Sequence, residues 1–127
     1  MTTEPLEYIR SAAGELVAAG AGLVAGHSAH VFHGVSGNVV FDLGDLVDDY
    51  AVDSLLRNDL GVLMVASLEG GGCGLRQIEA VPIALDYCFT RLARDDEYAW
   101  VRERFTRACA AFGTEVADTG ERLVITA

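Results

Sequence analysis

The sequence predicts a mixed α/β (α+β) fold in a single domain that spans residues 1–127. Two segments, one near each end of the chain, carry apolar residues at helical spacing. Between and after them lie apolar runs of strand length, separated by turns that contain glycine. A chain of 127 residues suits one compact domain, since at this size about two-thirds of the unfolded surface becomes buried. We therefore expect two main helices and a mixed sheet.

The first helix is predicted within residues 2–21, where apolar side chains recur every three or four positions. Thr2 or Thr3 is the expected N-cap, and Pro5 suits the first turn of a helix. The glycines at the end of this segment should stop the helix.

Three apolar strands are predicted next, at 22–26, 31–35 and 38–43. The first is bounded by glycine and should be buried on both faces if its sheet is parallel. The other two are joined by the turn residues 36–38 and read as a hairpin or as two successive strands. The acid-rich residues 44–61 are predicted to form a loop.

Residues 61–68 and 75–87 are expected to be antiparallel partners on either side of the glycine cluster at 69–74. Pro82 predicts that the second of these strands lies at a sheet edge or leaves the sheet, since proline has no N–H to donate. The glycine cluster lacks a following Lys-Ser/Thr and precedes a strand, so it reads as a hairpin tip and not as a phosphate-binding loop.

The second helix is predicted over residues 95–113, with Asp95 or Asp96 as N-cap and Gly113 as the stop. An apolar stripe supports it: Tyr98, Val101, Phe105, Ala108, Cys109 and Phe112. The remaining residues, 114–127, are expected to close the fold as a hairpin.

Charge and cysteine content narrow the classes of function. The formal net charge is −10 and the chain has no lysine, which disfavours binding to nucleic acid and to anionic lipid. Cys73, Cys88 and Cys109 form no C-x-x-C pair and predict neither a disulfide framework nor a zinc knuckle. No apolar stretch reaches the roughly 20 residues that span a bilayer, so no direct membrane insertion and a cytoplasmic location are expected.

All the histidines of the chain, His27, His30 and His33, follow Gly26 closely. Imidazole is a common metal ligand, and a His-x-x-His in the loop after a buried strand can turn both rings toward one ion. Had the strand continued, His27 and His30 would face opposite sides of the sheet. This cluster has two interpretations. The histidines contact a metal ion or a phosphate, or they are ordinary hydrogen-bonded residues.

Two imidazoles do not complete a metal site, because zinc takes about four ligands and manganese about six. The candidates for oxygen ligands lie downstream: Asp42, Asp45, Asp48, Asp49 and Asp53. Asp42 and Asp45 flank Gly44 after a strong strand and are the best of this set, whereas most of the others suit a solvated acidic loop. Cys73 has no histidine near it in sequence and is a poor candidate for a nucleophile.

Four segments together resemble the CapA-type poly-γ-glutamate capsule biosynthesis family, which belongs to the calcineurin-like metallophosphoesterases. They are GHSAHVFHG at 26–34, VVFDLGDLVDDY at 39–50, RNDLGVLMV at 57–65 and EAVPIALDY at 79–87. The resemblance covers nearly the whole of these residues. It implies a metal-dependent hydrolase in which His27 and His30 bind a divalent ion such as Mn, Fe or Zn.

The other metal-binding motifs of that family, a Gly-Asp segment, an Asn-His segment and a further histidine, have no counterpart in these residues. The resemblance therefore implies the C-terminal half of a four-layer sandwich, whose missing N-terminal half would finish the site. No catalytic acid can be assigned.

Two alternatives remain beside the hydrolase. The first is a non-catalytic module that forms a homo-oligomer through a bare strand edge, since an open apolar edge is a template for association. The second is a protein that binds a single metal ion through His27, His30 and a carboxylate such as Asp42 or Asp45.

Overall fold

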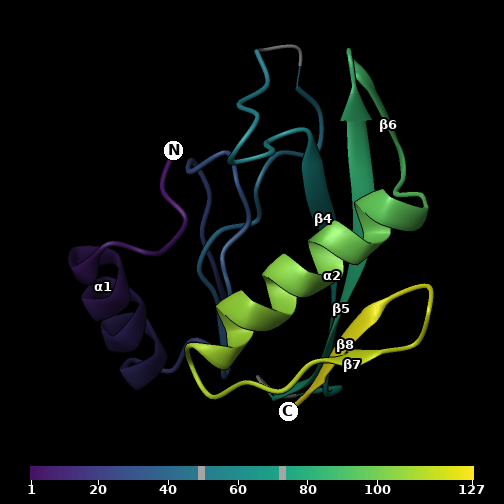
Figure 1. Ribbon diagram of the computed structural model, residues 1–127. Coiled ribbons are helices and arrows are strands. Elements are labelled where there is room, and N and C mark those ends of the chain that lie inside the picture. Colours follow the sequence, from purple (N-terminus) through teal and green to yellow (C-terminus); the bar gives the residue numbers. More distant parts are fainter. Residues whose placement is uncertain (49–50, 72–73) are drawn as a thin grey trace.

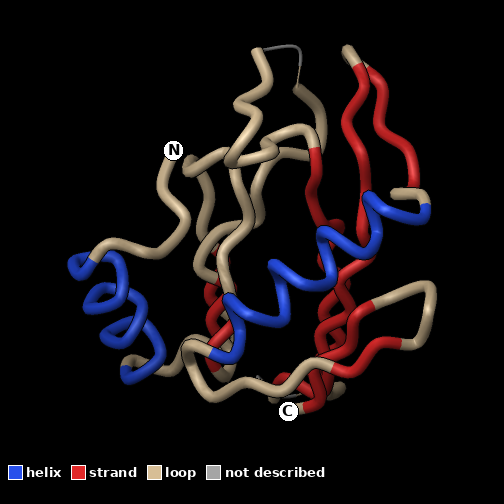
Figure 2. Tube along the Cα trace, in the orientation of Figure 1, coloured by secondary structure: helices blue, strands red, loops and turns tan. Residues whose placement is uncertain are grey.

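The computed structural model describes residues 1–48, 51–71 and 74–127 and confirms the predicted mixed α/β class. It contains two helices, a three-stranded mixed sheet and a five-stranded antiparallel sheet (Figures 1 and 2). Helix α1 (Glu7–Ala18) lies beside the small sheet, and helix α2 (Asp95–Ala110) crosses the larger sheet.

The small sheet has the order β1-β3-β2. Its strands are β1 (Val24–Ala25), β2 (Val35–Ser36) and β3 (Val39–Val40). The predicted hairpin is present, because β2 and β3 pair antiparallel around Gly37, whose φ of 57° suits glycine. β1 pairs with β3 in parallel, but it lies at the edge and its residues are partly exposed. The expectation that this strand is buried on both faces is therefore wrong.

The larger sheet follows the path β4-β5-β8-β7, and β6 also pairs with β5. Its strands are β4 (Leu60–Leu68), β5 (Leu75–Asp86), β6 (Phe89–Leu92), β7 (Ala117–Asp118) and β8 (Leu123–Thr126). The predicted antiparallel pairing of the two long strands and the C-terminal hairpin are both confirmed. Residues 69–71 and 74 join β4 to β5, and the other two residues of that glycine cluster, including Cys73, lie outside the described residues.

Pro82 does not mark an edge strand, because β5 is paired on both sides. On one side β4 runs along its length, with Val62 opposite Pro82. On the other side β8 pairs with residues 77–80 and β6 with residues 83–86. Pro82 lies where these two partners change over, so its missing N–H costs the sheet little.

The main core lies between α2 and the larger sheet. It includes Phe32, Val62, Ile78, Phe105 and Leu123, all of them almost fully buried. The rings of Phe32 and Phe105 meet edge to face with centroids 6.0 Å apart. A smaller cluster joins α1 to the small sheet through Ala13, Val39 and Phe41. The predicted apolar stripe of α2 thus points into the core, whereas that of α1 does so only in part, because Leu16 is exposed.

Both predicted N-caps are wrong. Helix α1 begins at Glu7 with Leu6 in the cap position, and no side chain caps it. Helix α2 begins at Asp95, with Arg94 in the cap position. There the Glu97 carboxylate accepts a hydrogen bond from the Arg94 backbone N–H at 3.0 Å, as the third helical residue does in a capping box.

In the described parts of the chain, neither helix has the length and apolar character needed to cross a bilayer.

Candidate metal centre

Two loops meet at one end of the small sheet because β1 and β3 run parallel. The Gly26 N–H donates to the Val40 carbonyl at 2.9 Å, and the Leu43 N–H donates to the Gly26 carbonyl at 3.0 Å. The chain therefore leaves both strands at the same edge, where ligands commonly bind in α/β folds. Residues 27–31 follow the first strand, and residues 44–48 follow the second.

Gly26 permits this close pairing. A Cβ atom at position 26 would lie 2.1 Å from the backbone oxygen of Phe41, far inside any contact distance. Any other residue would push the histidine loop away from β3.

Asp42 ties the two loops together. One of its carboxylate oxygens accepts a hydrogen bond from the Ala29 N–H at 3.0 Å, and the other accepts one from the Gly44 N–H at 2.9 Å. The residue is only 3% exposed. Because both oxygens are used, Asp42 positions the loops and is not among the side chains that gather for a metal ion.

The histidine loop has an unusual backbone. Ser28 has a φ of 90° and His30 a φ of 65°, although neither is glycine. Left-handed conformations of such residues cost free energy and are concentrated at binding and catalytic sites. Here the conformation directs the His30 ring toward the second loop.

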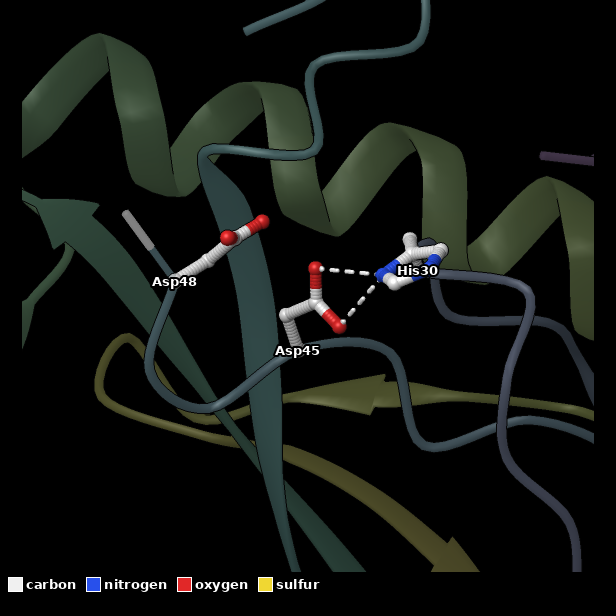
Figure 3. A group of neighbouring side chains, drawn as sticks. All are labelled: His30, Asp45 and Asp48. Atoms are coloured by element: carbon white, nitrogen blue, oxygen red, sulfur yellow. Dashed lines mark hydrogen bonds and ion pairs between the residues drawn. The ribbon is translucent and has the colours of Figure 1, made fainter. Parts of the chain in front are cut away.

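His30, Asp45 and Asp48 form the candidate site (Figure 3). One potential ligand atom from each side chain lies within 4.8 Å of the other two. The His30 Nδ1 is 3.1 Å from both carboxylate oxygens of Asp45. A search of the described residues for three or more His, Cys, Asp or Glu side chains close enough to hold one metal ion finds this group.

Electrostatics favour a cation between these groups. Burial raises the pKa of Asp45 above its ordinary value, a hydrogen bond with Asp48 and the charge of that residue raise it further, and His30 opposes the shift. Two neighbouring carboxylates therefore share a partly buried space with one imidazole. A divalent ion would offset both the desolvation and the repulsion.

The donor set fits a metal ion such as zinc or manganese. It offers one imidazole nitrogen and two carboxylates, and three protein ligands with an open position are typical of catalytic zinc sites. The His30 side chain is 49% exposed, so the site is open to solvent. Asp45 is more enclosed, at 18%.

His27 lies apart from this group. Its Nδ1 is hydrogen-bonded to the Ser28 hydroxyl at 2.7 Å, and its side chain lines a separate pocket of about 290 Å³ with His33 and Asp42. The group with metal-binding spacing includes His30 but not His27, so it does not support the prediction that these two histidines bind one ion. It stays a prediction.

His33 has a structural contact. Its Nε2–H donates to the Thr2 carbonyl at 2.8 Å, and its side chain is 3% exposed. This bond fastens the N-terminal segment to the histidine loop.

The other predicted acids have separate outcomes. The Asp53 carboxylate accepts backbone N–H groups of Leu55 at 2.9 Å and Leu56 at 2.8 Å, and these bonds lower its pKa. Asp53 thus stabilises a turn. Asp49 and Cys73 lie outside the described residues.

Sequence patterns alone ranked Asp48 too low, as one of several acids in a solvated loop. A signal was available, since Asp45 and Asp48 are separated by Leu46 and Val47 in a tight loop, which allows both carboxylates to face one point. The partner that fixes this direction, His30, comes from a different loop.

Comparison of the chain with models of protein families finds no match, and comparison with curated proteins finds none either.

Proposed function

We propose that this protein binds a divalent metal ion through His30, Asp45 and Asp48. The observation that carries the proposal is the meeting of these side chains from two loops within 4.8 Å, with the pKa of Asp45 raised by burial and by Asp48. Such perturbed carboxylates beside a histidine are typical of functional sites.

A divalent ion held there would supply Lewis acidity, which suits hydrolysis of a phosphoester. The residues of the chain would orient that ion. His30 holds a nitrogen donor at the solvent side, while Asp45 and Asp48 provide charge from the more enclosed side.

The resemblance to CapA-type metallophosphoesterases supports a hydrolase that acts in capsule polymer biosynthesis. We propose this activity for a larger assembly that supplies further metal ligands, because the other metal-binding motifs of that family have no counterpart in these residues. Under this proposal the described residues alone turn over little or no substrate.

The test is a titration of the purified protein with Mn²⁺ and Zn²⁺ by calorimetry, followed by an assay with a chromogenic phosphodiester. One ion should bind per chain. D45N should weaken binding at least about tenfold, since even removal of an outer-shell partner commonly costs 10–100-fold. H27Q is the matched control and should bind nearly as well as the wild type. Equal binding by D45N and the wild type would contradict the proposal.

A second candidate function is self-association through β4. This strand has no partner on its outer edge among the described residues, and its sequence LGVLMVASL contains neither a charge nor a proline. Leu63, Val65 and Leu68 are exposed on it. Unguarded edges of this kind pair with a second chain, so a homo-oligomer through β4 is the proposal.

We also propose a cytoplasmic location, which the cysteine chemistry supports. Cys88 is exposed and Cys109 is buried, and both are free thiols. Burial raises the pKa of Cys109 to about 11, so that thiol is unreactive. Exposed free thiols suit a reducing compartment. Cell fractionation tests the location.

A further inference from the structure

We propose that a second pocket, distinct from the metal site, binds a phosphate group. This pocket has a volume of about 320 Å³ and lies between the N-terminal segment, α1 and the C-terminal part of α2. Three arginines line it: Arg10 from α1, and Arg104 and Arg107 from α2. None of the ligands proposed for the metal ion lines this pocket.

Within the described residues the three arginines have no carboxylate partner closer than 3.9 Å, although the chain has 19 acids and nine arginines. Elsewhere four arginines pair with a carboxylate at 3.2 Å or less: Arg57, Arg91, Arg102 and Arg122. In the pocket, Arg107 comes no closer than 3.9 Å to Glu103, and both side chains are largely exposed. Such a surface pair adds little stability.

Arg10 and Arg104 make only weak or neutral contacts in the described chain. Arg10 donates to the Pro5 carbonyl at 3.4 Å and stacks over Phe112 at 5.0 Å. Arg104 donates to the Leu56 carbonyl at 3.2 Å, lies over the rings of Trp100 and Phe32 at 5.2 and 5.6 Å, and has a buried Nη2 without a hydrogen-bond partner among the described residues. Burial, and then repulsion from Arg107, lower the pKa of Arg104. An anion would relieve that repulsion.

Two negative groups nearby do not balance three guanidinium ions. Glu4 lines the pocket but forms no ion pair with a described arginine. The C-terminal end of α2 contributes about half a negative charge. The exposed Glu103 beside Arg107 offsets part of the rest, so the pocket keeps a net positive charge that an anion would neutralise.

Guanidinium groups are suited to phosphate because their planar forks donate two hydrogen bonds at once. The pocket volume is at the lower end of the range for small-molecule sites, about 300–1,000 Å³, so it has room for phosphate and a small attached group. Inorganic phosphate and a phosphomonoester share this chemistry.

The test is a titration followed by ³¹P NMR, in low salt and with EDTA present, so that phosphate bound through a metal ion cannot contribute. Inorganic phosphate and glycerol phosphate are the two probes, and acetate is the comparison anion. At least one phosphate probe should bind saturably, and acetate should bind at least about tenfold more weakly, because it carries a single charge and two oxygens. Tighter binding of glycerol phosphate would identify a monoester as the ligand, and tighter binding of inorganic phosphate would identify the free ion.

The variant is R10Q/R107Q, which leaves the packed Arg104 in place. It should weaken phosphate binding about tenfold or more, since hydrogen bonds to charged groups are lost. R76Q removes an exposed arginine on β5 and is the control, with a change below about twofold. Absence of saturable binding by the wild type, equal affinity for acetate, or equal losses in R76Q and R10Q/R107Q would each overturn the proposal. Circular dichroism of each variant shows that the fold is kept.

Discussion

His30 and Asp45 are 15 positions apart in the chain, yet the imidazole Nδ1 lies 3.1 Å from both carboxylate oxygens. The contact exists because parallel pairing of β1 with β3 places the two following loops at one edge. The Asp42 carboxylate holds the two loops together by accepting hydrogen bonds from the Ala29 and Gly44 N–H groups. The site is thus built on short but well-bonded strands.

Metal affinity should depend on pH through Asp45. Because its pKa is raised above 3.8 in the folded protein, protons compete with the metal at a higher pH than for an ordinary aspartate. Affinity for Mn²⁺ should therefore be full at neutral pH and fall as the pH drops through the raised pKa. Calorimetric titrations of the wild type and D45N from pH 7.5 down to 3.8 measure this. An identical pH dependence of the affinity in the two proteins would show that Asp45 is not a ligand.

Gly26→Ala should destabilise the fold, because the added Cβ meets the Phe41 oxygen at 2.1 Å. The expected loss in the free energy of unfolding is about 1–3 kcal/mol, as for other overpacking substitutions. Gly14→Ala is the control, since nothing lies within 4 Å of its Cβ position in α1. It should stabilise the protein by about 0.5–1 kcal/mol. Urea unfolding measures the free energy of unfolding of both variants. Equal values for the two would contradict the close approach of the backbone at Gly26.

Glu97→Gln should remove part of the acid resistance of the fold. The Arg91 guanidinium donates to both Glu97 oxygens, at 2.7 and 2.9 Å, and lowers the pKa of Glu97 from 4.5 to about 2. A lowered pKa contributes stability that is present above the unfolded value and is lost as the pH falls toward about 2.

The wild type should therefore unfold at a higher temperature than E97Q at pH 6, and the difference should shrink below pH 4.5 and vanish near pH 2. Glu103→Gln is the control, because Glu103 is exposed and 3.9 Å from Arg107. A difference that persists at pH 2 would point to lost packing and not to the ion pair.

Val65→Lys should abolish self-association, since a charge on an edge strand prevents pairing with another chain. Light scattering after size exclusion should give a dimer or larger species for the wild type and a monomer for V65K. Val52→Lys is the matched control, because Val52 is exposed but lies outside β4. A monomeric wild type would exclude association through this edge, and so would an oligomeric V65K.

The helices, the long hairpin and the C-terminal hairpin could be predicted from the sequence because their signals are local: periodicity, glycine turns and strand length. The parallel pairing of β1 with β3 could not be predicted, since no local pattern in either segment indicates which other strand it pairs with. The error at Pro82 has the same origin. Its strand changes partner from β8 to β6 at that position, and although β6 follows β5 directly, β8 lies about 40 residues further along the chain.

The candidate site was predicted in part for the same reason. The sequence singled out His30 and Asp45 but ranked Asp48 low, and its pairing of His30 with His27 stays a prediction. In the structure His27 bonds to Ser28 and His30 to Asp45, and both Ser28 and His30 have positive φ values. Backbone conformations of this kind cannot be predicted from residues that normally avoid them.

The most direct test is a crystal structure of the protein soaked with Mn²⁺, with anomalous diffraction to locate the ion. We expect one strong peak within about 2.0–2.3 Å of a His30 nitrogen and of oxygens from Asp45 and Asp48. No peak at these side chains, or a peak bound by His27 without Asp45, would contradict the account.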